Sequence, residues 1–207
     1  MKLNERGLLV VISGPSGVGK GTVRKALFEQ PGHNYTFSIS MTTRKKRIGE
    51  EEGKDYYFVS KEYFEEQIKK NAFLEYNYFC GNYYGTPLEK VEEALNSGKE
   101  LILEIDVNGC HQVKEKMPDS VTIFIVPPTK EALYTRLKGR GTESEYKISE
   151  RIAKADKEFK LAYQYDYIVV NDEVQNAASR IKAIIRAEHA RTSRSLAKYY
   201  EMLGDNK

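Results

Sequence analysis

The sequence predicts an α/β fold in which a parallel sheet is covered by helices on both faces. Four short apolar runs, each bounded by Gly, Pro or Asn, have the length of buried strands, and the segments between them show helical periodicity. Strands that are apolar on both faces and alternate with helices are typical of parallel sheets. The length of 207 residues fits one domain with modest insertions and leaves no room for two independent catalytic cores.

The elements are expected in the following order. Residues 7–13 contain five consecutive large aliphatics that end at a Gly-Pro-Ser-Gly turn, which predicts the first buried strand. Further strands are expected over 101–105, 121–126 and 167–170. Helices are expected over 20–30, 61–71, 87–97, 129–138, 143–163 and 174–203. Within 143–163, apolar residues at three- and four-residue spacing form one stripe, which comprises Ile148, Ile152, Ala155, Phe159 and Ala162.

Residues 35–84 break this pattern. Short alternating segments at 37–40, 56–59 and 73–79 surround one helix, which predicts a small mixed or antiparallel insertion on the parallel core. Eight of the 15 tyrosines lie in this stretch, so the insertion is also where phenols are concentrated.

The composition excludes several classes of protein. The 33 basic and 30 acidic residues nearly cancel, giving a net charge of +3, so the chain lacks the electrostatic footprint of a dedicated nucleic-acid binder. No apolar run approaches the roughly 18 residues of a membrane span, and the first residues lack a signal-peptide apolar region. We therefore expect a cytoplasmic protein without nucleic-acid or membrane partners. Cys80 and Cys110 are too few and too far apart for a disulfide framework or a zinc site, so free thiols are expected.

A phosphate-binding loop follows the first strand. Residues 14–20 fit the pattern G-x-x-x-x-G-K between an apolar strand and a helix, where backbone amides and the helix N-terminus bind phosphate oxygens. Lys20 would reach the β- and γ-phosphates. A plain Gly-rich turn is the alternative interpretation. The loop consists of Gly14, Pro15, Ser16, Gly17, Val18, Gly19 and Lys20.

One position departs from the usual form of this loop. Gly21 stands where Ser or Thr normally offers a hydroxyl to Mg²⁺, and Thr22 is one place late. Either Thr22 assists, or the metal is held mainly through water and phosphates, which Mg²⁺ tolerates because it keeps several waters.

A basic run covers residues 44–47. The acidic residues 50–52 follow at once and cancel its long-range field, which disfavours a nuclear-localisation or RNA-binding patch. Arg44 and Arg47, three residues apart, suit forked contacts to one phosphate. Taken alone, the run is more typical of a solvated charged loop.

Several motifs together resemble the guanylate kinases. They are the phosphate loop, SMTTRKKRIGE from residue 40, GKDYYF from residue 53, FLEYNYFCGNYYGTP from residue 73, LILEIDVNG from residue 101, RLKGRGTE from residue 136 and VVND ending at residue 172. The resemblance covers roughly residues 6–188. It implies a P-loop NTPase three-layer core (1–34, 91–136 and 156–207), a GMP-binding region (35–90) and a helical lid (137–155). The implied reaction is ATP + GMP to ADP + GDP with Mg²⁺, in purine nucleotide metabolism, with dGMP as a second acceptor.

The chemistry of guanine explains part of the resemblance. Guanine presents N1–H and N2–H₂ donors beside the O6 acceptor, so its pocket needs carboxylates against the first two and hydroxyls at the third. The resemblance assigns Glu75 and Asp106 as the carboxylates, and Ser40 and Thr86 as the O6-side hydroxyls. Without it, each carboxylate would be interpreted as an ordinary exposed residue. The resemblance also places Tyr56, Tyr84, Arg44 and Arg47 on the GMP phosphate.

On the ATP side, the resemblance assigns Arg136, Asn171 and Asp172 to the adenine, and Arg140 and Arg151 to phosphates. It extends the ATP-binding loop to Gly21 and Thr22. Catalysis would consist of positioning and cationic stabilisation by Lys20, Arg44, Arg140 and Arg151. Surface salt bridges for the arginines, and a helix-capping turn for 171–172, are the alternatives. Asp106 ends an apolar run and could also reach the metal through water.

Two other functions remain open from the sequence. One is a non-catalytic guanylate-kinase-like binding module, and the other is a kinase for another nucleoside monophosphate. The intact phosphate loop argues against the first, and Glu75, Asp106, Ser40 and Thr86 argue against the second. A homo-oligomer is possible.

Overall fold

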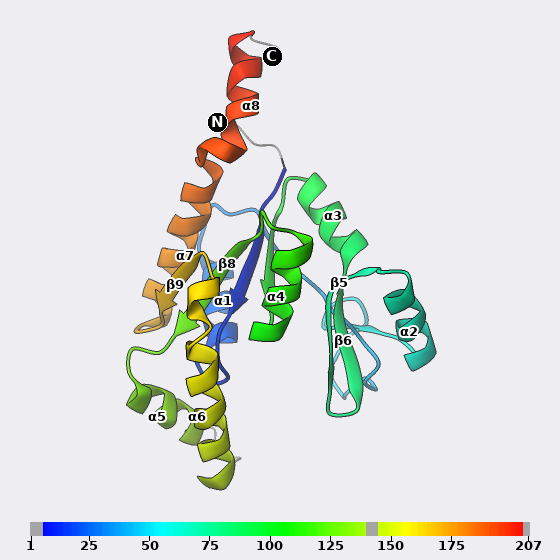
Figure 1. The fold of residues 1–207 in the computed structure, drawn as a ribbon, viewed down its shortest axis with the longest axis vertical. Coiled ribbons are helices and arrows are strands. Elements are labelled where there is room, and N and C mark those ends of the chain that lie inside the picture. Colours follow the sequence, from blue (N-terminus) through cyan, green and yellow to red (C-terminus); the bar gives the residue numbers. More distant parts are fainter. Residues whose placement is uncertain (1–5, 140–144, 205–207) are drawn as a thin grey trace.

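The computed structural model describes residues 6–139 and 145–204, and its centre is a five-stranded parallel sheet (Figure 1). The strand order is β2-β7-β1-β8-β9, and each neighbouring pair is parallel. The strands are β1 (Leu9–Ser13), β2 (Tyr35–Phe37), β7 (Glu100–Glu104), β8 (Val121–Val126) and β9 (Tyr167–Val170). The prediction of a parallel α/β fold is confirmed.

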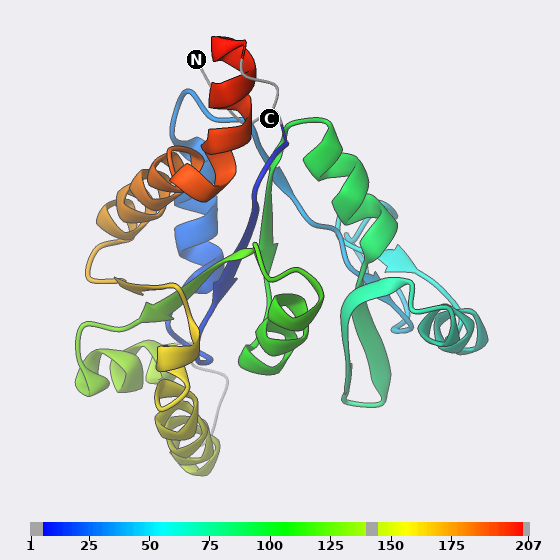
Figure 2. The same cartoon turned by 45° about the horizontal axis from the view of Figure 1, so that its top comes forward.

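Helices cover both faces of this sheet, as Figure 2 shows. Val10 and Ile12 of β1 pack against one pair of helices, and Leu9 and Val11 pack against the other, because successive side chains of a strand point to opposite faces. The first pair is α1 (Lys20–Glu29) and α7 (Val174–His189), and the second is α3 (Leu88–Asn96) and α4 (Val107–Lys116). Both faces of β1 are therefore buried, which explains its unbroken apolar run.

The predicted insertion forms a second sheet with the order β4-β3-β6-β5. Its strands are β3 (Met41–Thr42), β4 (Tyr57–Phe58), β5 (Phe73–Phe79) and β6 (Asn82–Pro87), and the sheet is mixed because only β3 and β4 are parallel. Helix α2 (Lys61–Lys69) covers it through Phe64, whose ring stacks on Phe73 and Tyr83 at centroid distances of 4.2 and 5.1 Å. Aromatic packing thus holds this sheet together.

The insertion begins later than expected. We predicted that it starts at residue 35, but Tyr35, Thr36 and Phe37 pair in parallel with Glu100, Leu101 and Ile102 of the central sheet. Strand β2 lies at the edge of that sheet and all three of its residues are only partly buried. Its mixed polar and apolar sequence therefore resembles an antiparallel strand, although it belongs to the parallel core.

Two helices follow β8 and contact the phosphate loop. They are α5 (Lys130–Lys138) and α6 (Glu145–Phe159). Residues 140–144, between them, lie outside the described part of the chain. Ile148 and Ala155 of α6 are buried, and Ile152 and Phe159 pack against the same cluster, so most of the predicted stripe is confirmed. The helix is shorter than predicted, because Ala162–Gln164 form a separate 3₁₀ turn.

The helix expected over 174–203 is two helices. Helix α7 ends at His189, and α8 (Thr192–Leu203) begins after an extended Arg191 with ψ 130°. Ser195 Oγ donates to the backbone carbonyl of His189 at 2.9 Å, which stabilises the break. Figure 1 shows α8 extending beyond the end of the sheet.

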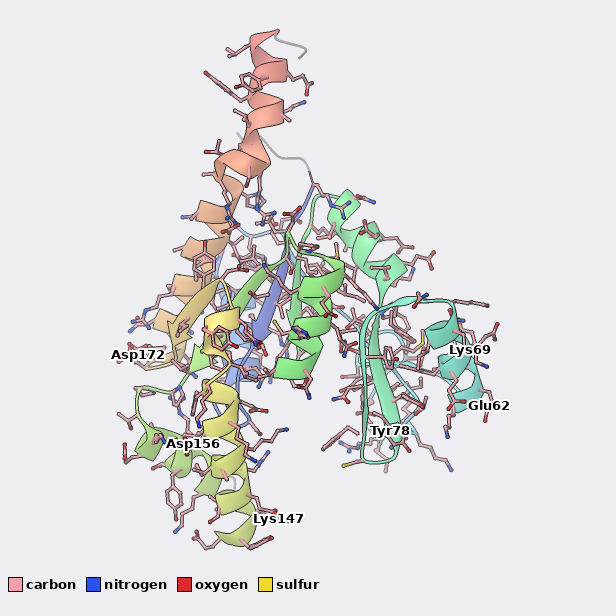
Figure 3. All side chains as sticks on the ribbon, viewed as in Figure 1. Glu62, Lys69, Tyr78, Lys147, Asp156 and Asp172 are labelled. Atoms are coloured by element: carbon pink, nitrogen blue, oxygen red, sulfur yellow. The ribbon has the colours of Figure 1, made fainter. Side chains whose placement is uncertain are left out.

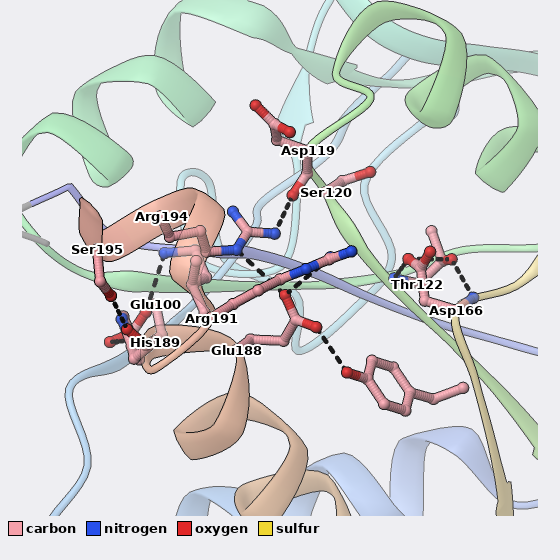
Figure 4. Close-up of polar contacts among 12 residues, drawn as sticks. Glu100, Asp119, Ser120, Thr122, Asp166, Glu188, His189, Arg191, Arg194 and Ser195 are labelled. Carbon is pink, nitrogen blue, oxygen red and sulfur yellow. Dashed lines mark hydrogen bonds and ion pairs between the residues drawn. The ribbon is translucent and has the colours of Figure 1, made fainter. Parts of the chain in front are cut away.

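A polar cluster fixes this junction at the end of the sheet where β7 begins (Figure 4). The buried carboxylate of Glu188 accepts from Tyr167 Oη at 2.6 Å and from Arg194 Nε at 3.1 Å. The ring of His189 lies 2.8 Å from the buried carboxylate of Glu100, which also accepts from the Leu8 amide. Each buried carboxylate is therefore hydrogen-bonded, as burial requires.

Cys80 is exposed and Cys110 is buried, and both are free thiols, as predicted. Across the described ranges, no helix combines the length and apolar composition required to span a bilayer.

Candidate nucleotide-binding site

The glycine-rich loop lies between β1 and α1, at the carboxyl end of the central strand. Gly14 and Gly19 have φ values of 138° and 91°, which L-residues with a side chain rarely adopt. A Cβ on Gly19 would also lie 2.6 Å from Asn171 Nδ2, and a Cβ on Gly14 would lie 2.5 Å from the Ile125 carbonyl oxygen. The backbone therefore turns tightly here, which leaves its amides free of side-chain obstruction.

Two residues support this loop from the core side. Asn171 is buried at the end of β9, and its Nδ2 donates to the Val18 carbonyl at 2.8 Å. The Arg136 guanidinium of α5 donates to the Val18 carbonyl at 3.2 Å and to the Asn171 carbonyl at 2.8 Å. The loop is thus held by two side chains from distant parts of the sequence.

Lys20 and Arg151 lie on the open side of the loop. The Lys20 ammonium donates to the carbonyls of Gly14 and Pro15 at 2.6 and 3.2 Å. Burial lowers the pKa of Lys20, while the nearby carboxylate of Glu104 opposes this effect. Arg151 of α6 donates through Nη2 to Ser16 Oγ at 2.9 Å. A lysine and an arginine therefore flank the loop, with their cationic groups held by polar contacts.

A cavity of about 390 Å³ opens beside the loop. Its lining includes Lys20, Gly21, Thr22, Lys25 and Glu104. Glu104 ends β7, and its Oε2 accepts from Arg24 Nε at 3.0 Å. Sequence reasoning did not assign Glu104, although its position at the end of an apolar strand is the signal that could have identified it. Cations and one carboxylate thus share a cavity at the mouth of the loop.

A second cavity, of about 550 Å³, lies between the end of the central sheet and the small sheet. Its lining residues come from both sheets, from α4 and from α6. They are Ser40, Tyr56, Glu75, Asn77, Phe79, Tyr84, Glu104, Ile105, Asp106, Asn108 and Lys154. Five of these, Ser40, Tyr56, Glu75, Tyr84 and Asp106, were singled out from the sequence, so the fold brings together residues up to 66 positions apart.

Glu75 is the most buried acid in this cavity, with 6% of its surface exposed. Thr86 Oγ1 donates to Glu75 Oε1 at 2.6 Å. Burial raises the pKa of Glu75 to about 7, and the nearby negative charge of Asp106 acts in the same direction. A carboxyl poised in this way can be an acceptor for donors that enter the cavity, once it is ionised.

Asp106 caps α4 at the edge of the same cavity. Its Oδ1 accepts from the Gly109 amide at 2.9 Å, and its Oδ2 accepts from Asn77 Nδ2 at 3.3 Å. The capping bond fixes the side chain relative to the helix N-terminus. Glu75 and Asp106 therefore present two carboxylates to one cavity from different sheets.

Two tyrosines and an arginine lie beside these carboxylates. The rings of Tyr56 and Tyr84 meet edge to face at a centroid distance of 6.1 Å. The Arg44 guanidinium lies 5.4 Å from the centroid of Tyr56 and forms a forked ion pair with Glu50, at 2.7 and 3.1 Å. Because of this contact with Glu50, the pKa of Arg44 is raised.

Comparisons with known proteins decide the family. The family model "Guanylate kinase" matches residues 6–188. The chain is 60% identical to the guanylate kinase of Onion yellows phytoplasma (strain OY-M) over 207 residues, which is 100% of this chain and 98% of that protein. It is 54% identical to the guanylate kinase of Lactiplantibacillus plantarum over 201 residues, covering 97% of this chain and 98% of that one. The chain belongs to the guanylate kinase family.

A solved guanylate kinase has the same fold. The crystal structure from Anaplasma phagocytophilum is 33% identical and superposes with a TM-score of 0.75, covering 99% of this chain and 100% of that one. The fold class inferred from the guanylate kinase resemblance is confirmed by this likeness. The parallel core and the small mixed sheet are therefore shared features of a guanylate kinase.

Arg47 and Asp172, both assigned through the guanylate kinase resemblance, are exposed and line neither cavity. The Arg47 side chain is exposed, and its backbone amide donates to Glu50 at 2.8 Å. Asp172 forms a forked ion pair with Arg180 at 2.7 and 2.9 Å, and Figure 3 shows it on the outer side of the core. The Arg180 contact lowers the pKa of Asp172. Arg140 lies outside the described residues.

Glu50 is a second residue that sequence reasoning did not assign in this guanylate kinase. It was interpreted only as part of the acidic run that cancels the basic run before it. Its carboxylate instead holds both the guanidinium of Arg44 and the amide of Arg47. The spacing of six residues between Arg44 and Glu50 carries no regular helix or strand signal, so only the folded loop reveals the pair.

Proposed function

We propose that this chain transfers the γ-phosphate of ATP to GMP or dGMP, giving ADP and GDP or dGDP. One observation carries the proposal: a glycine-rich loop with Lys20 opens into one cavity, a second cavity holds the buried carboxylate of Glu75, and Glu104 lines both. Two cavities with a common wall suit a donor and an acceptor nucleotide. Membership of the guanylate kinase family supports the same activity.

The second cavity is proposed as the GMP site. Ionised Glu75 would accept from guanine N1–H and N2–H₂, with Asp106 as the other carboxylate. The hydroxyls of Ser40 and Thr86 would serve O6. Adenine lacks the N1–H donor, so it would leave a buried carboxylate unpaired, and this is the physical basis proposed for selectivity.

The GMP phosphate is assigned to the cluster of Arg44, Tyr56 and Tyr84, with Arg47 beside it. Arg44 forms a forked pair with Glu50, so the phosphate would exchange with, or join, that carboxylate. The phenols donate hydrogen bonds without adding charge. The arginines already offset part of the repulsion between the two anionic substrates, so neutral hydrogen-bond donors are sufficient at the remaining positions.

The first cavity is proposed as the site of the ATP phosphates, held by the loop from Gly14 to Lys20 with Gly21 and Thr22. Lys20 would exchange its carbonyl partners for phosphate oxygens, and Arg151 would remain at the loop beside Ser16. Arg136, Asn171 and Asp172 are proposed on the adenine side, and Arg140 on the phosphates. Catalysis then rests on positioning and on cationic stabilisation by Lys20, Arg44, Arg140 and Arg151.

Mg²⁺ is proposed as the cofactor, bound with ATP. Thr22 and Glu104 line the loop cavity with oxygen atoms, the type of ligand that Mg²⁺ prefers, and Asp106 lies on the neighbouring cavity. When bound, Mg²⁺ neutralises part of the phosphate charge. The described residues contain no group of three or more His, Cys, Asp or Glu that could hold a metal by themselves, so nucleotide phosphates would complete the coordination.

We also propose a functional division of the chain into a core, a GMP-binding region and a lid near residues 137–155. The GMP-binding region begins after β2, since β2 pairs within the core sheet. The lid would exclude water, because an open site would hydrolyse ATP. The two other functions considered from the sequence are not favoured by the likeness to guanylate kinases over the full chain.

A coupled ADP-release assay tests the proposal. We expect turnover with GMP and dGMP and little with AMP, CMP or UMP. Lys20→Ala should abolish turnover with every acceptor, whereas the control substitution Lys69→Ala, at an exposed lysine of α2 that lines neither cavity, should retain it. Equal rates with AMP would refute the guanine assignment, and no turnover with any nucleotide would favour a binding module.

A further inference from the structure

Helix α6 carries a lysine whose place is unexplained by the assignments above. Lys154 follows Arg151 by three residues, so the two side chains leave neighbouring positions on one side of the helix. Arg151 reaches Ser16 in the phosphate loop, whereas Lys154 lines the second cavity. One helix therefore extends a cation toward each of the two proposed nucleotide sites.

The second cavity, which Lys154 lines, is otherwise acidic. Its described lining residues include three carboxylates, those of Glu75, Glu104 and Asp106, and Lys154 is the one lysine or arginine among them. A nucleotide phosphate that enters from this side meets acidic walls. A phosphoryl group crossing between the cavities would need a cation there, because negative charge spreads over its equatorial oxygens.

Lys154 also lies close to the loop. Burial is the main reason that the pKa of Lys20 is lowered, and the positive charge of Lys154 acts in the same direction. The Lys154 ammonium is 3.5 Å from Glu158 one helical turn later, whose side chain is mostly buried. Glu158 itself interacts electrostatically with Lys20. The Lys154 side chain, 66% exposed, thus pairs with Glu158 at the wall of the second cavity and lies near enough to Lys20 for their charges to interact.

We propose that Lys154 is a further cation for the phosphoryl group during its transfer from ATP to the nucleoside monophosphate. Glu158, 3.5 Å from the ammonium, is its positioning residue. This inference rests on the proposed function, since it needs the two cavities to hold donor and acceptor. It predicts an effect on the chemical step rather than on the binding of either nucleotide alone.

Steady-state kinetics of Lys154→Ala, Lys154→Arg and Lys157→Ala test the inference. Lys154→Ala should lower kcat on the order of tenfold or more and change KM for GMP and ATP by less than about threefold. Lys154→Arg should recover most of the rate, because it restores a cation. Lys157→Ala removes an exposed lysine of the same helix and should behave as the wild type. Unfolding temperatures should be equal for all four proteins.

A binding measurement gives an independent result. The probe is a bisubstrate analogue in which a phosphate chain joins adenosine to guanosine, so that it occupies both cavities at once. Lys154→Ala should weaken the analogue on the order of tenfold while leaving GMP alone within about twofold. A structural role for Lys154 would not separate these two ligands.

Three results would overturn the inference. They are a kcat of Lys154→Ala within about twofold of the wild type, a loss confined to KM for GMP, and an unchanged affinity for the bisubstrate analogue. The proposed guanine site fails in a different way, by equal turnover of AMP and GMP, and the Lys154 comparison can then be made with whichever acceptor is used. Failure of one proposal is therefore distinguishable from failure of the other.

Discussion

Thr86 donates a 2.6 Å hydrogen bond to a Glu75 carboxyl that is almost fully buried in the acceptor cavity. The Thr86 hydroxyl is a hydrogen-bond donor to this carboxyl, and burial raises the pKa of Glu75 to about 7. Glu75 can therefore change its protonation state in the range where kinases operate. Both the binding of GMP and the stability of the free protein should depend on that change.

The affinity for GMP should fall in mildly acidic solution. Protonated Glu75 cannot accept from both N1–H and N2–H₂, so KM for GMP should rise about tenfold per pH unit below pH 7 and stay constant above it. Glu75→Gln should raise KM for GMP about a hundredfold at pH 8 and remove this pH dependence. A wild-type KM that is constant from pH 5.5 to 8, measured with saturating ATP, would contradict the assignment.

Glu75 should affect the stability of the free protein with the opposite pH dependence, favouring the folded state at low pH. Because the folded-state pKa of Glu75 lies above its unfolded value, its contribution is present at low pH and is lost as pH rises through about 7. Glu75→Gln should thus gain stability relative to the wild type as pH increases from 5 to 8, by up to a few kcal/mol. Urea unfolding without nucleotide, at several pH values, measures this difference. A constant difference across that range would show that Glu75 does not titrate there.

Binding of GMP should depend on the two-nitrogen geometry of the Arg44 guanidinium and not only on its positive charge. Its guanidinium pairs with Glu50 through two nitrogens, and a phosphate would be bound in the same way. Arg44→Lys should therefore raise KM for GMP about tenfold, although the charge is kept. Lys45→Ala, which removes the neighbouring exposed lysine, is the matched control and should leave KM unchanged. Equal KM values for Arg44→Lys and the wild type would exclude forked binding.

Gly21 should accept a serine. A Cβ at this position would lie 3.6 Å and 3.7 Å from the two Glu104 oxygens, which is ordinary contact. Gly21→Ser should raise the free energy of unfolding by about 0.5 kcal/mol, because Gly is a poor helix former. It should also lower the Mg²⁺ concentration needed for half-maximal rate. Gly19→Ser, with φ 91° and Asn171 in the way, should lose stability instead. A Mg²⁺ requirement that does not change in Gly21→Ser would show that no hydroxyl is used there.

Asn171 and Asp172 should differ sharply although they are adjacent. Asn171→Ala leaves the buried Val18 carbonyl without its Nδ2 donor, so it should cost about 1–3 kcal/mol of stability and raise KM for ATP. Asp172→Asn alters an exposed pair with Arg180 and should cost less than about 1 kcal/mol. Thermal unfolding and ATP titration of both variants separate support of the loop from direct contact with adenine. An effect of Asp172→Asn on KM for ATP equal to that of Asn171→Ala would favour direct contact.

The junction between α7 and α8 should affect stability without affecting catalysis. Arg194→Ala removes a hydrogen-bonded cation from the buried carboxylate of Glu188, which should cost about 3 kcal/mol. Arg191→Ala removes a longer and more exposed contact, 3.6 Å from the same carboxylate, and should cost less than about 1 kcal/mol. Neither should change kcat, since the junction contacts Glu100 at the start of β7, whereas the cavities are lined by Glu104 at the end of that strand. A lowered kcat for Arg194→Ala at a temperature where the protein is folded would show communication between the two ends.

The sequence predicts the parallel sheet because each of its central strands is buried on both faces and reads as an unbroken apolar run. Edge strand β2 escapes this signal, since its residues are only partly buried. The break after His189 is missed for another reason: Ala190 and Arg191 fit a helix by composition, and the break depends on Ser195 and Arg194 bonding back to α7 and its surroundings.

In the candidate site, too, features set by local sequence are predicted and features set by tertiary contacts are not. The phosphate loop is predicted because its chemistry is confined to seven consecutive residues. Glu50 is not predicted, since it is defined by its pair with Arg44, which only the folded loop forms. Glu104 has a signal in the sequence, the end of an apolar strand, but its partner Arg24 is brought close only by the fold. Lys154 carries no sequence signal, because a single lysine on a charged helix is indistinguishable from a solvated one.

Glu104 has a consequence for how the two nucleotides influence each other. Of the described residues, it is the one that lines both cavities. A donor that moves or neutralises this carboxylate changes the wall that the acceptor meets, and linkage requires the acceptor to change the donor's affinity by the same factor. Synergy between the substrates can thus be transmitted through a single shared side chain, without any rearrangement of the backbone.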